Sequence, residues 1–213
     1  MRIGVLGGSF NPPHYGHLRL AEAALASGLV DAVLFVPASV PPHKKTPFEA
    51  SAATRLAMTR LLAHGDPRLS VDGLELEREG PSYTIDTMHE LWERNPENDY
   101  RLVIGSDMAK IFATWRDWRE LLRLAPPLVA ERPDAGLDGL PETLFPDLPE
   151  EERSILLAGR FAMQPVAINS TIVRRRIREG AGIGELAGYM PDGVLRYIVK
   201  RGLYGWHEMR RGG

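Results

Sequence analysis

The sequence predicts an α/β fold, and two features near its start predict it. An apolar run at 3–6 is followed by a glycine turn and by a stretch of good helix formers at 18–26. A second apolar run, 31–37, ends at a proline. Strand, helix and strand at this spacing form the βαβ unit of a parallel sheet. We therefore expect a Rossmann-like, doubly wound parallel sheet flanked by helices, with a small helical portion at the C-terminus.

The rest of the chain continues the alternation of strands and helices. We expect one domain over residues 1–205, with an irregular surface insertion at 133–149 and a tail at 206–213. We expect strands at 69–72, 100–104 and 127–132, and one or two short strands in 161–168. We expect helices at 52–63, 85–94, 108–112 and 150–158, a further helix that starts near 169–171, and a last one from about Pro191 to Gly202. The expected caps are Ser51 for the first of these helices, which would be buried through Leu56, Met58, Leu61 and Leu62, Ser82 or Thr84 for the second, and Asn169, Ser170 or Thr171 for the fifth.

Composition excludes several classes of protein. Hydrophobic residues make up 44% of the chain and charged residues 25%, which is ordinary for a globular domain. A formal net charge of -2 argues against a general nucleic-acid surface. There is no cysteine, so disulfides and thiolate metal ligands are excluded. No apolar run reaches the roughly 20 residues of a membrane span, and no secretory leader is visible. We expect a cytoplasmic protein without membrane or nucleic-acid partners; the sequence leaves the oligomeric state open, a homo-oligomer included.

The glycine turn carries the strongest functional signal. It reads GGSFNPPHYGH, from Gly7 to His17. A helix that starts after a strand directs unpaired N–H groups and the positive end of its dipole at one point, which suits a phosphate. Glycines let phosphates approach the backbone. His14 and His17 are three residues apart, so they share a face and can both donate hydrogen bonds to anionic oxygens. The simpler alternative is a turn that closes a strand and carries two surface histidines.

A second anion-binding signal lies far along the chain, at 168–178. Three polar residues at a helix start are followed by arginines, which together suit a polyanion. Arg174 and Arg178 are four residues apart and share a face, whereas Arg175 and Arg176 point elsewhere. The alternative is a surface helix with a basic stripe.

Weaker signals lie between these two segments, at predicted strand ends and helix starts. His43 and Lys44 belong to a basic loop at the carboxyl edge of the sheet, where ligands bind in open α/β folds, although it equally suits a solvated loop. Tyr83 and Thr84 start a helix and can offer N–H groups to an anion, or simply form a cap.

The ends of two later strands carry further candidates. Gly105 admits a flat ligand, and Asp107 can orient a base or sugar. Arg132 follows a strand and can reach a phosphate. Trp115 and Trp118 are three residues apart, a spacing that is more typical of core residues than of a ligand site.

These motifs resemble a known family. GGSFNPPHYGH is similar to the phosphate-binding signature, with its His-x-Gly-His element, of the nucleotidyltransferase superfamily. The further motifs resemble bacterial nicotinate-nucleotide adenylyltransferases over roughly residues 1–205; one departure is Asn169, where that family usually has serine, and asparagine can still cap the helix. The motifs that carry this likeness are Ser82-Tyr83-Thr84-Ile85-Asp86-Thr87, Gly105-Ser106-Asp107, Trp115 with Trp118, Glu131-Arg132-Pro133, Ser170-Thr171-x-x-Arg174 and Gly202-Leu203-Tyr204.

The resemblance implies a reaction in which ATP and nicotinate mononucleotide, with Mg²⁺ as cofactor, give deamido-NAD and pyrophosphate. It assigns no metal ligand. It implies catalytic roles for His14, His17 and Arg174. It implies that ATP is bound by Gly7, Gly8, Ser9, Phe10, Gly105, Asp107, Ser170 and Thr171, and nicotinate mononucleotide by His43, Lys44, Tyr83, Thr84, Trp115 and Arg132.

Other functions are less consistent with these motifs. Pantetheine-phosphate adenylyltransferases share the first signature but are shorter and lack the Ser-Tyr-Thr and Trp-x-x-Trp motifs. Class I aminoacyl-tRNA synthetases carry a Lys-Met-Ser-Lys-Ser loop, which is absent here. A regulatory nucleotide-binding protein without turnover would have no need to keep both histidines and Arg174.

Overall fold

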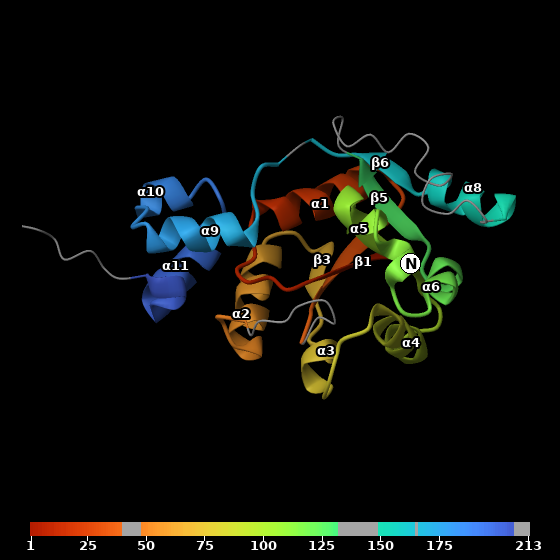
Figure 1. Cartoon of the computed structure of the whole chain (residues 1–213), viewed down its shortest axis with the longest axis horizontal. Coiled ribbons are helices and arrows are strands. Elements are labelled where there is room, and N and C mark those ends of the chain that lie inside the picture. Colours follow the sequence, from red (N-terminus) through yellow and green to blue (C-terminus); the bar gives the residue numbers. More distant parts are fainter. Residues whose placement is uncertain (40–47, 132–148, 165, 207–213) are drawn as a thin grey trace, which may run out of the picture.

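The computed structural model of the chain describes residues 1–39, 48–131, 149–164 and 166–206 (Figure 1). These residues contain a six-stranded sheet ordered β3-β2-β1-β4-β5-β6, in which all neighbouring strands are parallel. The strands are β1 (Arg2–Gly8), β2 (Ala32–Pro37), β3 (Leu69–Val71), β4 (Asp99–Gly105), β5 (Pro127–Glu131) and β6 (Arg160–Ala162).

Helices connect the strands and cover both faces of the sheet. They are α1 (Tyr15–Ala26), α2 (Ala52–Ala63), α3 (Leu74–Glu77), α4 (Thr84–Arg94), α5 (Ser106–Ala109), α6 (Trp118–Leu124), α8 (Glu150–Ala158), α9 (Ser170–Arg178), α10 (Ile183–Leu186) and α11 (Asp192–Arg201), with 3₁₀ turns η1 (Phe112–Thr114) and η2 (Leu203–Gly205).

Alternate residues of the central strands enter two separate cores, one on each face of the sheet. Leu6 of β1 packs in the core that α1, α2, α9 and α11 complete. Its neighbour Val5 packs in the core that α3, α4 and α6 complete. Because successive side chains of a strand point to opposite faces, this partition shows helices on both faces. The predicted doubly wound parallel sheet is confirmed.

The chain ends in a small group of helices, as expected. In Figure 1, α9, α10 and α11 lie together at one end of the molecule, and α8 lies at the other. Helix α11 starts directly after Pro191 and ends at Gly202, whose φ of 59° is the left-handed conformation that glycine tolerates. No helix among the described residues is long and apolar enough to cross a membrane.

Several local predictions are wrong. Neither Ser82 nor Thr84 caps α4: Tyr83 occupies the N-cap position and its side chain makes no capping hydrogen bond. In α2 the buried face contains Arg55 and Thr59 beside Met58 and Leu62, whereas Leu56 and Leu61 are only half-buried. The helix expected at 108–112 is divided between α5 and η1. Helices α3, α6 and α10 were not expected at all; α3 and α10 are single turns too short for a clear periodic pattern.

The strand order fixes where a ligand can bind. The chain leaves β1 toward β2 on one side, and β4 lies on the other side of β1. Ligands of open α/β sheets bind beyond the carboxyl ends of the strands where the order reverses in this way. The carboxyl ends of β1 and β4 are Gly8 and Gly105, so the two glycine-containing motifs meet at this edge.

Candidate active site

The loop after β1 is anchored by Phe10. Its ring is fully buried, 5.8 Å from the ring of Phe35 and 4.7 Å from that of His17. Its φ of 44° is unusual for a residue other than glycine. A Cβ on Gly8 would lie 3.2 Å from the Phe10 ring, so glycine suits this close approach. The side chain of Phe10 thus belongs to the core, and only its backbone is left for a ligand.

His14 and His17 form a reciprocal cap at the start of α1. His14 is the N-cap residue, and its Nδ1 accepts a hydrogen bond from the N–H of Gly16 at 3.1 Å. The N–H of His14 donates to Nδ1 of His17 at 3.2 Å. The ring centroids lie 3.8 Å apart. The two imidazoles are therefore held as one rigid pair.

These contacts set the protonation state of both rings. Burial lowers the pKa of His14 to about 4. Burial, with a smaller contribution from His14, lowers the pKa of the half-buried His17 well below its usual range. Both rings are therefore neutral at pH 7. Since each Nδ1 accepts a hydrogen bond, the proton of each neutral ring is assigned to Nε2, which becomes a donor.

The sequence predicts that unpaired N–H groups at the start of α1 receive a phosphate, and the structure corrects this prediction. The N–H of Tyr15 donates to the carbonyl of Tyr189 at 2.8 Å, and that of Gly16 is used by His14. The first N–H groups of α1 therefore already have partners. The donors available at this point are the Nε2–H groups of the histidines.

Helix α9 packs its first turn against the same loop. The hydroxyl of Ser170 donates to the carbonyl of Pro12 at 2.9 Å, and Nη1 of Arg174 donates to the carbonyl of Asn11 at 2.7 Å. Asn169 caps the helix by accepting from the N–H of Ile172 at 2.9 Å, as predicted. The two segments that the sequence singles out are thus in direct contact, although more than 150 residues separate them.

The arginines of α9 divide into two sets. Nε of Arg174 lies 3.0 Å from a carboxylate oxygen of Glu49, and Nη2 of Arg178 lies 2.5 Å from the other. Nη2 of Arg174 also donates to the hydroxyl of Thr171 at 3.4 Å. Arg175 pairs instead with Glu179 on the opposite side. The predicted shared face of Arg174 and Arg178 is confirmed.

Two further residues contact this loop, Arg55 and Tyr204, and sequence reasoning gave neither of them a role in the site. Buried Arg55 donates to the carbonyl of Ser9 at 2.9 Å, and its guanidinium lies 4.1 Å from the ring centre of Phe48. Buried Tyr204 donates to Oδ1 of Asn11 at 2.9 Å. Arg55 lies on the buried helical stripe of α2, so a cation at such a position was a usable signal. Tyr204 was noted only as part of the Gly202-Leu203-Tyr204 motif, which gives no indication of its contact with Asn11.

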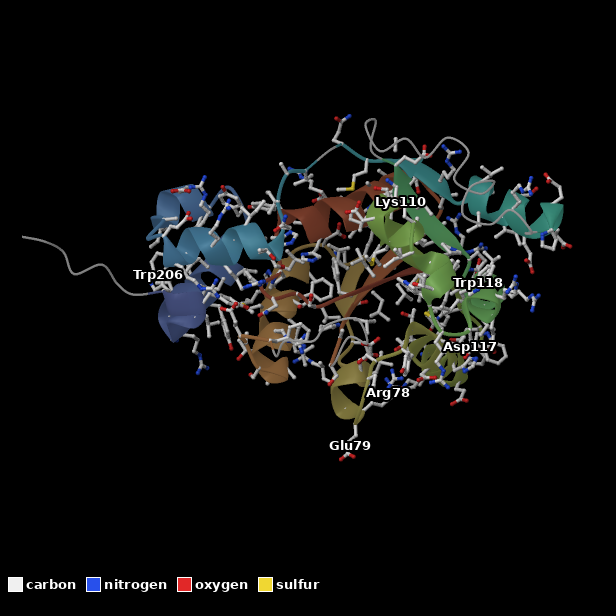
Figure 2. All side chains as sticks on the ribbon, in the orientation of Figure 1. Arg78, Glu79, Lys110, Asp117, Trp118 and Trp206 are labelled. Atoms are coloured by element: carbon white, nitrogen blue, oxygen red, sulfur yellow. The ribbon has the colours of Figure 1, made fainter. Side chains whose placement is uncertain are left out.

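A second group of predicted residues lies around the start of α4. The guanidinium of Arg116 lies 4.8 Å from the ring centre of Tyr83, and Trp115 directly precedes Arg116. Trp115 packs 5.5 Å from Phe112, and its Nε1 is buried without a hydrogen-bond acceptor among the described residues. Tyr83, Thr84 and Trp115 are thus brought to one region. Trp118 lies on α6, away from Trp206 at the other end of the molecule (Figure 2).

The end of β4 is open. A Cβ on Gly105 would meet nothing within 4 Å. Asp107 is exposed in the first turn of α5. Both therefore border the carboxyl edge of the sheet. His43, Lys44 and Arg132 lie outside the described residues.

The described residues contain no group of three His, Cys, Asp or Glu side chains that could hold a metal ion. A small divalent cation of the Mg²⁺ type binds oxygen ligands in octahedral geometry and usually keeps several waters beside phosphate oxygens. The donor set here, imidazoles and arginines, therefore suits anions and not a protein-built cation cage.

Comparison with known proteins identifies relatives along the whole chain. Residues 5–176 match the family described as cytidylyltransferase-like. A protein of Halalkalibacterium halodurans named "Probable nicotinate-nucleotide adenylyltransferase" is 39% identical to this chain, and the match covers 99% of this chain and 94% of that protein. A protein of the same name from Bordetella petrii is 40% identical, and the match covers 95% of this chain and 98% of that protein. In fold, the chain is similar to Plasmodium falciparum nicotinic acid mononucleotide adenylyltransferase complexed with NaAD, with a TM-score of 0.72, 16% identity, and coverage of 97% and 98%.

Proposed function

The chain belongs to the cytidylyltransferase-like family and, within it, to the nicotinate-nucleotide adenylyltransferases, and we propose that it transfers the adenylyl group of ATP to nicotinate mononucleotide. The products are deamido-NAD and pyrophosphate. The observation that carries this function is that the loop leading into the stacked His14–His17 pair is held by α9, through hydrogen bonds from Ser170 to Pro12 and from Arg174 to Asn11. It gathers neutral donors and a cation where a triphosphate would lie beyond β1.

The reaction needs no general base. A phosphate oxygen of nicotinate mononucleotide, already ionised at neutral pH, attacks the α-phosphorus of ATP. The bond from that phosphorus to the bridging oxygen of the β-phosphate breaks, and its electron pair leaves with pyrophosphate. Catalysis then depends on alignment, which can lower the barrier by about 7–11 kcal/mol, and on donors aimed at developing charge.

His14, His17 and Arg174 are the proposed catalytic residues. The Nε2–H groups donate to phosphate oxygens without changing their own charge, because both rings are neutral. Arg174 is already held by the carbonyl of Asn11 and by Glu49, so it needs little reorganisation when the substrate binds. Such preorganised donors are worth more in a water-poor site than in solvent.

The remaining ATP-binding roles go to two loops and the end of β4. Gly7, Gly8, Ser9 and Phe10 contribute mainly backbone groups, since the Phe10 ring is buried. Ser170 and Thr171 contribute the first turn of α9; among the described residues, none accepts a hydrogen bond from their N–H groups. Gly105 and Asp107 contribute to the adenosine side.

The acceptor mononucleotide is assigned to the α4 region. The N–H groups of Tyr83 and Thr84 meet the nicotinate carboxylate, and Trp115 stacks on the pyridine ring. A helix start favours an anion, so the acid is preferred over the neutral amide. His43, Lys44 and Arg132 hold the mononucleotide phosphate in this proposal.

Magnesium enters the proposal with the nucleotide. The described residues contain no group of three His, Cys, Asp or Glu side chains that could hold the ion, and Mg²⁺ usually binds through substrate phosphates, so it would arrive with ATP and neutralise part of the triphosphate charge. The cytoplasmic location expected from the sequence remains part of the proposal.

The test is pyrophosphate release from ATP with nicotinate mononucleotide, nicotinamide mononucleotide or phosphopantetheine as the acceptor. We expect efficient release with the first and much slower release with the second. Comparable efficiency with the amide would contradict the assigned carboxylate site. Release with phosphopantetheine, or nucleotide binding without release, would favour the alternative functions.

A further inference from the structure

A buried acid lies beneath the start of α4 and has no role in the mechanism above. Glu75 of α3 is 6% exposed, and burial raises the pKa of its carboxyl group. The hydroxyl of Thr87, 2% exposed, donates to Oε1 of Glu75 at 2.7 Å. The hydroxyl of Ser82 forms a second hydrogen bond to the same carboxyl group. Glu75 is therefore a double acceptor in the interior.

The two hydroxyls flank the proposed carboxylate-binding turn. Ser82 directly precedes Tyr83 and Thr84, and Thr87 follows them within the first turn of α4. The N–H of Thr87 also donates to the carbonyl of Tyr83 at 3.3 Å. Tyr83 provides no side-chain cap. The first turn of α4 is thus held by the hydrogen bonds of Ser82 and Thr87 to Glu75, and not by a side-chain cap of its own.

The network continues into neighbouring elements. The N–H of Ser39, just beyond the end of β2, donates to the hydroxyl of Ser82 at 3.1 Å. Nη2 of Arg78, which follows α3 (Figure 2), donates to the hydroxyl of Thr87 at 2.8 Å. Each hydroxyl thus accepts one hydrogen bond, from Ser39 or from Arg78, and donates one to the carboxyl group of Glu75. The sheet edge, α3 and α4 are therefore tied together through this single carboxyl group.

From this geometry we propose that Glu75 is a positioning residue for the acceptor mononucleotide. It holds the N–H groups of Tyr83 and Thr84 in the place where they receive the nicotinate carboxylate. The inference rests on the proposed function, because it uses the binding role assigned there to these N–H groups.

The chemistry of the network explains why an acid is needed. A carboxylate presents two acceptor oxygens and no competing donor. Glutamine would keep one acceptor and place an amide donor against a hydroxyl that already donates. Alanine would remove the acceptor of the Ser82 hydroxyl and would leave the Thr87 hydroxyl only its long contact to the carbonyl of Tyr83, at 3.4 Å. An unmade hydrogen bond in the interior is costly.

The test compares KM values for the two substrates in Glu75→Ala and Glu75→Gln. We expect the KM for nicotinate mononucleotide to rise on the order of tenfold or more in Glu75→Ala, with the KM for ATP within about twofold of wild type. Glu75→Gln should fall between wild type and Glu75→Ala. Thr87→Val, which removes one hydroxyl at nearly constant shape, should give the same selective rise and serves if Glu75→Ala does not fold.

Leu91→Ala is the matched control. Leu91 is buried in the last turn of α4 and lies outside the network, so its loss destabilises the helix packing alone. It should lower the melting temperature without a selective change in KM. The same selective rise in Leu91→Ala, or equal rises in both KM values in the Glu75 and Thr87 variants, would overturn the inference. Wild-type protein without activity on nicotinate mononucleotide would overturn the proposed function as well.

Discussion

His14 and His17 stack with their ring centroids 3.8 Å apart, and each accepts a backbone hydrogen bond at Nδ1. The same two contacts cap α1 and assign the proton of each ring to Nε2. Structure and chemistry are thus coupled in this pair: the cap that starts the helix also leaves two neutral donors for phosphate oxygens.

The first prediction concerns stability in acid. In the unfolded chain a histidine titrates near pH 6.5, whereas the pKa of folded His14 is about 4. Between these values the unfolded state binds more protons than the folded state. The contribution of neutral, folded His14 to the free energy of unfolding is therefore complete above about pH 6.5 and is lost as the pH falls toward 4. We expect the melting temperature to fall accordingly in a pH series measured by calorimetry.

The variant His14→Asn isolates this effect. Asparagine is a good N-cap residue, so the cap is kept while the titrating ring is lost. The pH dependence of the melting temperature should be shallower in His14→Asn. The exposed residue His64 provides the control, and His64→Asn should retain the wild-type dependence. An unchanged slope in His14→Asn would show that His14 is not held neutral by folding.

The second prediction concerns Arg174. Its guanidinium contacts the carbonyl of Asn11, the hydroxyl of Thr171 and Glu49 at the same time. Lysine has a point charge and cannot reproduce this fork. Steady-state kinetics with varied ATP should show kcat/KM lower by about 10²-fold or more in Arg174→Lys.

Arg175→Lys is the matched control for this change. Arg175 is largely exposed and pairs only with Glu179 among the described residues. Its kcat/KM should stay close to wild type. Equal losses in Arg174→Lys and Arg175→Lys would mean that general positive charge on α9, and not the specific position of Arg174, supports the reaction.

The third prediction concerns Tyr204, whose hydroxyl donates to Oδ1 of buried Asn11 at 2.9 Å. Tyr204→Phe leaves that oxygen without its donor, which should lower the free energy of unfolding by about 1–3 kcal/mol. Urea denaturation measures this as a lower midpoint. Tyr197→Phe, at a half-buried residue of α11, should have little effect. A midpoint as high in Tyr204→Phe as in Tyr197→Phe would show that this hydrogen bond does not contribute to the stability of the fold.

The sequence predicts the order of strands and helices because buried parallel strands appear as continuous apolar runs. Local caps were also predictable: Ser51 accepts from the N–H of Thr54, and Asn169 from that of Ile172. The cap of α1 was not, because histidine is not a usual N-cap residue. The two histidines were nonetheless identified as a pair, since their spacing is a local property of the helix.

Contacts between distant segments were beyond the reach of periodicity. The pair between Glu49 and Arg174 joins residues from α9 and the segment before α2, and no local pattern encodes it. Glu75 was missed for a similar reason, because its hydrogen-bond donor Thr87 belongs to another helix. Such contacts depend on how the helices pack across the sheet, which only the folded structure shows.

The kcat of His17→Ala with ATP and nicotinate mononucleotide, beside His64→Ala as control, measures directly whether the histidine pair stabilises the reacting phosphates. Losing one donor aimed at developing charge typically costs about 10²–10³ in kcat. We therefore expect a loss of that size in His17→Ala and wild-type turnover in His64→Ala. A kcat for His17→Ala within about twofold of wild type would contradict the claim that these neutral imidazoles stabilise the reacting phosphates.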